Sequence, residues 1–389
     1  MTELFAVIER PQINRTGAPR LPGLDVTRAI ALIGVVIMNY HGYLNGGDDG
    51  VNRSLAERVF EPYKGPLSTR FAATFVFVAG MGITLLTNRS RLSEDATAVK
   101  VAAVREDRWR LIRRGLLLGS LGLIIEWIWH GTILFFYGAF FIAGAFLFTV
   151  ALRWLIVVGA SAALAGAGIA WFRINQQLDG HDASWLDPPI TSPRNLLLRT
   201  FVGYTHPLLP WLAFLCAGIA VGRLLPLATR HRIRLLAAGL AMFATTYAIN
   251  YVGLRSVSND VANSSTFARR SRFLLSTSPF DRGLLYTIGT LGSSLVAFCL
   301  ISWLADRAPT AVITKVFQHA GQMTLTLYVA HVLFFNALVH WYHTVGATGL
   351  DTALGLSISF WVLAIAFGAW WHRFLGAGPL ERIHRGFGG

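Results

Sequence analysis

The sequence predicts an all-α protein, a polytopic helical bundle in a membrane with about ten spanning helices. Of its 389 residues, 54% are hydrophobic and 14% are charged, whereas a soluble domain carries about 25% charged residues. Apolar stretches of roughly 20 residues, the length that crosses a bilayer, recur along the whole chain. They cover residues 28–46, 67–87, 114–131, 133–152, 154–172, 207–225, 233–254, 283–305, 317–341 and 353–373.

The distribution of charge predicts the orientation of these spans. With the N-terminus in the cytoplasm, the inner segments carry 22 Lys and Arg against 9 Asp and Glu, and the outer segments carry 12 against 11. An excess of basic residues on the cytoplasmic side is the rule for membrane proteins. Ten spans return the basic C-terminus to the same side. The net charge of +14 therefore orients the chain, and we expect no nucleic-acid partner.

The chain is expected to be one membrane domain with short ends. Residues 1–24 hold charged side chains and no apolar core before a cleavage site, so we interpret them as a cytoplasmic arm and not as a signal peptide. Asp25 is the expected N-cap of the first helix. Residues 25–374 form the transmembrane domain, and residues 375–389 form a basic cytoplasmic tail.

Three long connections separate the spans. The inner connection 88–114 carries eight basic residues. The outer segments 173–206 and 255–282 are rich in Ser, Asn, Asp and Arg. Long loops in compact proteins are often functional, so we expect the two outer segments to recognise a substrate.

Titratable side chains inside spans are costly and indicate function. Glu126 is the only acidic residue within an apolar stretch, and His130 follows four residues later on the same helical face. Tyr328 and His331 lie one turn apart in the ninth span. His206 opens the sixth span, shortly before Trp211. We predict a cavity that holds an acceptor and is lined by His206, Trp211, Tyr328 and His331.

His41 ends the first span, where "VVIMNYHGYLNGG" passes from apolar to polar residues. At a rise of about 1.5 Å per residue, His41, Glu126, His130 and His331 all lie roughly 18–24 Å from the cytoplasmic edge. They could therefore meet in one polar layer. Structural roles stay open: His41 as an interfacial hydrogen-bonder, His331 as a link between helices, and Glu126 as the partner of His130 or of an arginine from an outer segment.

Arginines gather where two spans begin on the cytoplasmic side. Arg110, Arg113 and Arg114 precede the third span, and Arg28 opens the first. Such residues can act as a topological stop and bind lipid phosphate. Guanidinium groups also suit the phosphates of a nucleotide-like donor that enters from the cytosol.

No metal or permanently bound cofactor is expected. Cys216 and Cys299 both lie within apolar spans, so they form neither a metal site nor a disulfide framework. The sequence has no P-loop, no GxGxxG after a strand, no HExxH and no GxSxG. ATP-driven transport, Rossmann cofactors, zinc hydrolysis and serine hydrolysis therefore find no support.

Four stretches together resemble a known family. They are, in order, "LPGLDVTRAIALIGVVIMNYHG", "FAATFVFVAGMGITLL", "HPLLPWLAFLCAGIAVGRLL" and "FQHAGQMTLTLYVAHVLFF". In this order, and on corresponding spans, they resemble the heparan-α-glucosaminide N-acetyltransferase-like transmembrane acyltransferases. The resemblance implies that acetyl-CoA or another acyl-CoA enters from the cytosol and that the acyl group passes to an acceptor on the other face.

The resemblance also implies roles for single residues. The catalytic histidine near the outer end of the first span corresponds to His41, the family's asparagine to Asn39, and its arginine after Leu-Asp to Arg28. The chain departs from the family at Ala29, where a glycine is usual, and at Thr132, where relatives have aspartate. His41 also lies closer to the asparagine than in most relatives.

We therefore expect a multi-pass plasma-membrane acyltransferase, of bacterial type by its composition. It would move an acetyl or other acyl group from acyl-CoA, a co-substrate, to an extracytoplasmic glycan or lipid. Asn39 would stabilise the oxyanion beside His41, and Glu126 would orient His41 or His130. Two alternatives stay open: a carrier without chemistry, and a non-catalytic subunit of an envelope-assembly complex. Membrane lipids are expected partners, and a homo-oligomer is left open.

Overall fold

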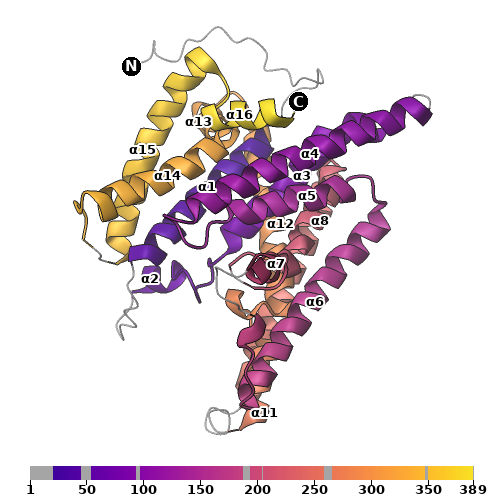
Figure 1. The fold of residues 1–389 in the computed structure, drawn as a ribbon, viewed down its shortest axis with the longest axis vertical. Coiled ribbons are helices and arrows are strands. Elements are labelled where there is room, and N and C mark those ends of the chain that lie inside the picture. Colours follow the sequence, from indigo (N-terminus) through magenta and orange to yellow (C-terminus); the bar gives the residue numbers. More distant parts are fainter. Residues whose placement is uncertain are drawn as a thin grey trace.

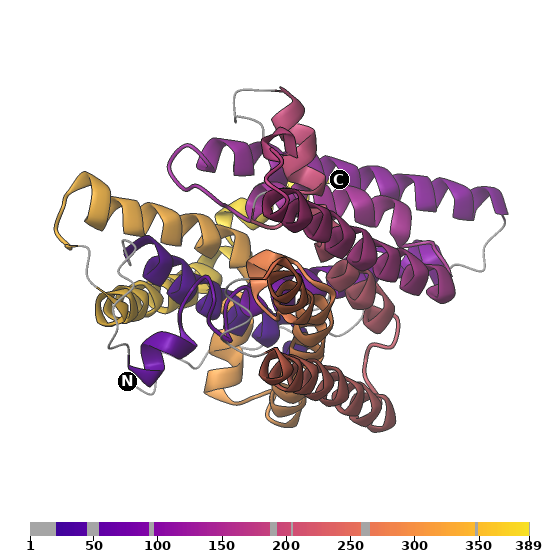
Figure 2. The same ribbon diagram turned by 90° about the horizontal axis from the view of Figure 1, so that it is seen from below.

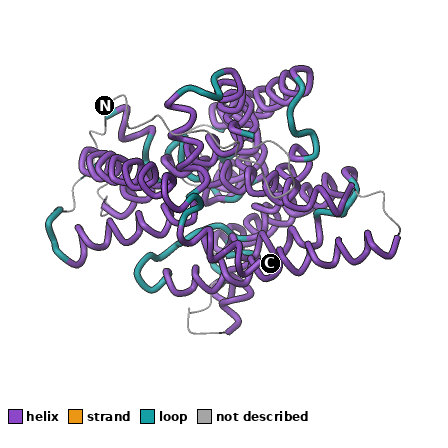
Figure 3. Tube along the Cα trace, turned by 90° about the horizontal axis from the view of Figure 1, so that it is seen from above, coloured by secondary structure: helices purple, strands orange, loops and turns teal. Residues whose placement is uncertain are grey.

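Each of the ten predicted spans overlaps a helix of at least 13 residues in the part of the chain that the structure describes, which confirms the predicted all-α fold class (Figure 1). The computed structural model describes residues 21–44, 54–92, 97–186, 193–203, 205–257, 265–346 and 349–388, and these contain helices and loops but no strand (Figure 3). The ten helices are α1 (Pro22–Leu44), α3 (Arg70–Leu92), α4 (Thr97–Ile125), α5 (Leu134–Leu147), α6 (Leu152–Leu178), α8 (Leu208–Gly222), α9 (Thr229–Ser256), α12 (Leu284–Arg307), α14 (Thr324–Asn336) and α15 (Leu350–Leu375).

Seven of these regions are long and apolar enough to cross a membrane, if α14 is counted with the π-helical turn Ala337–Trp341 that continues it. Helices α5 and α8 are apolar but shorter. Helix α4 differs because its first half is polar. The chain is therefore a membrane protein, as predicted.

Helix α4 corrects the prediction at both of its ends. Residues 97–113, expected in a loop, are helical, since they hold no Gly or Pro and several strong helix formers. Arg110 bonds Glu106 (3.1 Å) and Asp107 (2.6 Å) along this stretch. At the other end α4 stops at Ile125, so Glu126 and the residues after it lie in a turn and not on a helix face.

The ends of the chain differ from the prediction as well. Helix α1 begins at Pro22, a residue type favoured at the first helical position, so Asp25 lies inside the first turn and is not the N-cap. Its carboxylate accepts hydrogen bonds from Arg28 (3.5 Å) and Gln322 (3.3 Å). The predicted tail contains the helix α16 (Pro379–Gly388), which packs on α4 and α14.

Helix α1 is central and contacts α3, α12, α14, α15 and the short helix α13 (Val312–Gln322). Seen from below, α14 and α15 lie on one side of the bundle and α4 to α6 on the other (Figure 2). Helices pack closely where glycines meet: a Cβ on Gly138 would lie 2.6 Å from the carbonyl oxygen of Gly115, between α5 and α4. Small residues at helix contacts are typical of membrane bundles.

The two ends of the bundle carry different short helices. Helix α11 (Thr266–Leu275) packs on α6 and α9 at the tip farthest from α13 and α16 (Figure 1). We call the α11 end the outer end and the α13 and α16 end the inner end, following the predicted orientation. Helices α2 (Leu55–Val59) and α7 (Pro193–Phe201) belong to outer connections.

Candidate functional site

His41 lies in the last turn of α1 with only 2% of its surface exposed. Its Nδ1 lies 2.7 Å from the carbonyl oxygen of Phe60, just after α2. A carbonyl can only accept, so Nδ1 carries a proton, and in the neutral form of an imidazole with this tautomer Nε2 carries the lone pair. The contact therefore fixes both the orientation and the tautomer of the imidazole.

The segment that supplies this carbonyl is organised by one carboxylate. Glu61 accepts hydrogen bonds from the backbone N–H groups of Tyr63 (3.1 Å), Gly65 (2.9 Å) and Lys64. A side chain at Gly65 would clash, because a Cβ there would lie 2.4 Å from the carbonyl oxygen of Glu61. The Glu61 carboxylate thus stabilises the tight turn that follows Phe60.

Asn39 does not meet His41. Two residues apart on a helix, the side chains diverge by about 200°. The Nδ2 of Asn39 instead lies 3.4 Å from Nε2 of His331 on α14. Nδ1 of His331 donates to the carbonyl of Tyr328, so Nε2 is the acceptor for the Asn39 amide. Asn39 therefore does not point at His41, and its role as an oxyanion donor stays a prediction.

His331 is fully buried in an aromatic box. The rings of Tyr40, Trp129, Tyr328 and Phe360 surround it, with centroids 4.8–6.2 Å from its own. The hydroxyl of Tyr40 also donates to the carbonyl of His331 (2.9 Å). The polar layer predicted from His41, Glu126, His130 and His331 does not form, because Glu126 pairs with Arg199 and the His130 side chain is exposed. His331 instead lies in a layer with Asn39 and Tyr328 that side chains fill. Tyr328 and His331 therefore do not line an open cavity here.

The turn between α4 and α5, residues 126–133, connects this layer to the outer segments. The hydroxyl of Thr132 lies 3.0 Å from the hydroxyl of Tyr328. The carbonyl of His130 accepts from the hydroxyl of Tyr43, while the His130 side chain is exposed. His130 therefore contributes its backbone to the contact and not its imidazole.

Glu126 forms a buried ion pair with Arg199 of α7. Its two oxygens lie 2.9 and 2.7 Å from the two terminal nitrogens of the guanidinium, and the side chains are 11% and 6% exposed. Of the roles left open, the structure shows pairing with an arginine from an outer segment. Glu126 orients neither His41 nor His130, which corrects that expectation. Arg199 was missed, although it follows three leucines in a polar segment.

His206 and Trp211 meet at the outer end of α8, with ring centroids 4.7 Å apart. Nδ1 of His206 lies 2.8 Å from the hydroxyl of Thr205. Trp211 is only 1% exposed. The two residues predicted to line an acceptor cavity are therefore neighbours, but they pack against each other.

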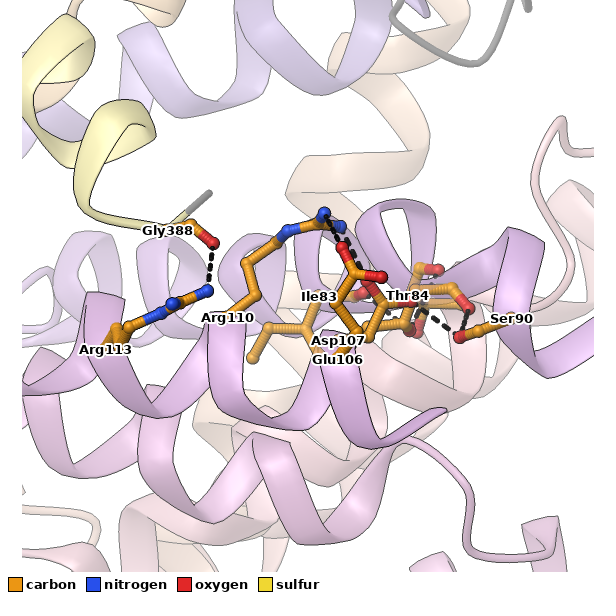
Figure 4. Close-up of polar contacts among 9 residues, drawn as sticks. Ile83, Thr84, Ser90, Glu106, Asp107, Arg110, Arg113 and Gly388 are labelled. Carbon is orange, nitrogen blue, oxygen red and sulfur yellow. Dashed lines mark hydrogen bonds and ion pairs between the residues drawn. The ribbon is translucent and has the colours of Figure 1, made fainter. Parts of the chain in front are cut away.

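The four arginines predicted to bind a donor all contact other parts of the chain. Figure 4 shows Arg110 directed at Asp107 and Glu106, and Arg113 donating to the carbonyl of Gly388 (3.0 Å). Gly388 also packs against Arg114, so α16 covers this end of the patch. Arg28 pairs with Asp25 and reaches Gly82 of α3.

Two pockets open at the outer end within the described residues. One, of about 210 Å³, lies between α6 and the segment 280–282. The other, of about 540 Å³, lies between the segment 64–66, the end of α9, and α11 with the residues after it. The predicted substrate-recognition segment 255–282 contributes to both. None of the predicted site residues lines either one.

No metal centre is evident in the described part of the chain, where no three His, Cys, Asp or Glu side chains cluster. Cys216 and Cys299 are both buried.

Residues 20–257, more than half of the chain, match the family described as heparan-alpha-glucosaminide N-acetyltransferase, catalytic. The chain belongs to this family. Residues 225–387 also match a family described as a protein of unknown function, DUF418. No curated protein matches the chain. The resemblance predicted from four motifs is thus confirmed, and the chain is a membrane protein of acetyltransferase type.

The two matches divide the site. The heparan-alpha-glucosaminide N-acetyltransferase match contains α1 to α9, and with them Asn39, His41 and Glu126. Tyr328 and His331 lie in the range that matches the second family only. The Asn39–His331 contact therefore joins two separately matched parts of the chain.

Proposed function

We propose that the protein transfers an acetyl or other acyl group from cytosolic acyl-CoA to a glycan or lipid acceptor at the outer end, with His41 as the catalytic residue. The observation that supports this most is the contact between His41 Nδ1 and the Phe60 carbonyl. It leaves Nε2 as the atom that takes a proton, as in other sites where a fixed partner selects the tautomer of a catalytic histidine.

The step balances with His41 as a base. Nε2 takes the proton from an acceptor hydroxyl or amine, the acceptor oxygen or nitrogen bonds to the acyl carbon, and the carbon–sulfur bond breaks. The departing CoA sulfur then receives the proton. Arg28 lies on the same helix 13 residues before His41, about 20 Å away, so the pantetheine arm would have to span that distance.

Acyl-CoA would approach Arg110, Arg113 and Arg114 from the inner end. Guanidinium groups bind phosphate bidentately. Because Arg113 donates to Gly388, donor binding would displace or rearrange the end of α16. The plasma membrane is the location that we propose for this reaction.

A non-catalytic role is the second candidate. The layer of Asn39, Tyr328 and His331 is filled by aromatic side chains, as in a scaffold subunit. This packing favours a structural role for His331, and it leaves the role of His41 to experiment.

Acyl transfer is tested with purified wild-type protein, His41→Ala and His181→Ala, an exposed outer histidine that lines neither pocket. Acetyl-labelled CoA and envelope extract are added, and free thiol and transferred label are followed. We expect His41→Ala to bind acetyl-CoA but to lose at least about 100-fold in turnover, while His181→Ala stays active. Turnover by His41→Ala at the wild-type rate, or no thiol release by wild type, would overturn the proposal.

A further inference from the structure

The larger outer pocket is built around a buried cation. Arg70, the first residue of α3, is 8% exposed. Its guanidinium donates to the Pro66 carbonyl (2.5 Å), to the hydroxyls of Thr290 (3.2 Å) and Ser293 (3.1 Å), and to the hydroxyl of Tyr247 (2.8 Å). Among the described residues, every hydrogen-bond partner of this guanidinium is neutral, and no carboxylate forms an ion pair with it.

A buried charge without a counter-ion is costly. Neutral hydroxyls and the rings of Phe243 and Tyr247, each 5.7 Å from the guanidinium carbon, offset part of that cost. An anion bound nearby would offset the rest. Pro66 and Tyr247 both line the pocket of about 540 Å³, so Arg70 lies directly behind its wall.

Tyr247 contacts both Arg70 and the pocket. Its hydroxyl oxygen accepts from Arg70, which leaves its own O–H to donate elsewhere. No acceptor for that proton is found in the part of the chain that the structure describes. Because Tyr247 lines the pocket, a ligand oxygen there can accept this hydrogen bond.

The rest of the pocket has the same character. Lys64 and Arg272 supply two more cations against one carboxylate, Asp281, and Asp281 already accepts from the hydroxyl of Ser276. Thr277 and Ser278 add polar groups to the lining. Cations combined with hydroxyl donors are the chemistry that binds phosphate.

We infer that this pocket binds the phosphate group of a phosphorylated sugar or of a lipid headgroup. A short segment connects the pocket to His41. Its first residue, Phe60, accepts the hydrogen bond from His41, and Lys64 and Pro66 further along it line the pocket. If the proposed function holds, the pocket is where a phosphate-bearing acceptor is held, and only that assignment depends on the proposed function. Binding itself does not.

Binding is measured with the protein in phosphatidylcholine nanodiscs, by calorimetry with glucose 1-phosphate and with glucose as its uncharged match. We expect glucose 1-phosphate to bind, glucose not to bind, and added salt to weaken binding. Tyr247→Phe and Lys64→Ala should each weaken binding about tenfold. Tyr251→Phe, one turn further along α9, and Arg269→Ala on α11 are matched controls that line neither pocket.

A second arm distinguishes the source of the phosphate. Nanodiscs that contain phosphatidic acid should compete with glucose 1-phosphate if the pocket takes a lipid headgroup, and should leave binding unchanged if it takes a soluble sugar phosphate. Equal binding of glucose and glucose 1-phosphate, no binding of either phosphate probe, or equal losses in Tyr247→Phe and Tyr251→Phe would overturn the inference. His41→Ala should bind normally, so loss of transfer and loss of binding are separable.

Discussion

At the scale of single residues, fixed partners determine what each polar side chain can do. The Phe60 carbonyl selects the tautomer of His41, and the Asn39 amide selects the use of Nε2 in His331. Among the described residues, His41 therefore has a hydrogen-bond partner for one ring nitrogen, whereas His331 has a partner for both. Their sequence contexts do not reveal this difference, because both lie in apolar helices at similar depth.

The Glu126–Arg199 pair carries a stability prediction. Removing one member of a buried pair leaves the other charge uncompensated, so Glu126→Gln should lower the free energy of unfolding by about 3 kcal/mol. Reversible denaturant unfolding in detergent measures this loss. Arg270→Gln is the control, since it breaks the more exposed pair with Asp179 and should cost less than about 1 kcal/mol. Equal effects of the two variants would contradict a structural role for Glu126.

At the scale of elements, short helices close both ends of the bundle. Helix α16 is held by Glu381, whose carboxylate accepts from the backbone N–H groups of Leu325 (2.6 Å) and Thr326 (3.1 Å) and from the Thr326 hydroxyl (2.6 Å). This carboxylate thus satisfies N–H groups at the start of α14 that have no partner within the helix. A segment expected to be a tail is therefore part of the fold.

Glu381 should make the docking of α16 depend on pH. Burial raises the pKa of Glu381 more than its hydrogen bonds lower it. A raised pKa means that the folded state favours the protonated acid, so its contribution is complete below the unfolded pKa and declines as pH rises through the folded pKa. Limited proteolysis of the C-terminus should therefore speed up from about pH 5 to pH 8 in wild type. The neutral variant Glu381→Gln should lack this trend, and the same trend in both would argue against Glu381.

At the scale of the whole molecule, the ten helices form one bundle whose two ends have different chemistry. The inner end carries arginines that contact α16, and the outer end carries the two pockets. The acyl transfer that we propose needs such a division. The orientation itself still rests on the distribution of charge in the sequence.

Cysteine labelling tests this orientation. In a Cys216→Ala, Cys299→Ala background, a cysteine is placed at His181 near the outer end or at Arg105 on the inner half of α4, both exposed. In intact cells we expect a membrane-impermeant maleimide to label position 181 and to label position 105 only after permeabilisation. The reverse pattern would invert the topology and place the pockets in the cytoplasm.

The sequence by itself determined the class of protein, the all-helical membrane fold and the family, because hydrophobic length, charge asymmetry and short motifs are local properties of the chain. It also placed His41, Glu126, His130 and His331 at one depth, but the structure does not bring these four together. Only the tertiary structure decided the partners: His331 for Asn39, Arg199 for Glu126, and Tyr247 for Arg70. These contacts join residues 73 to 292 positions apart, and they depend on helix rotation and on where each helix ends. The hydropathy pattern of a sequence specifies neither the rotation of a helix about its axis nor the residue at which it ends.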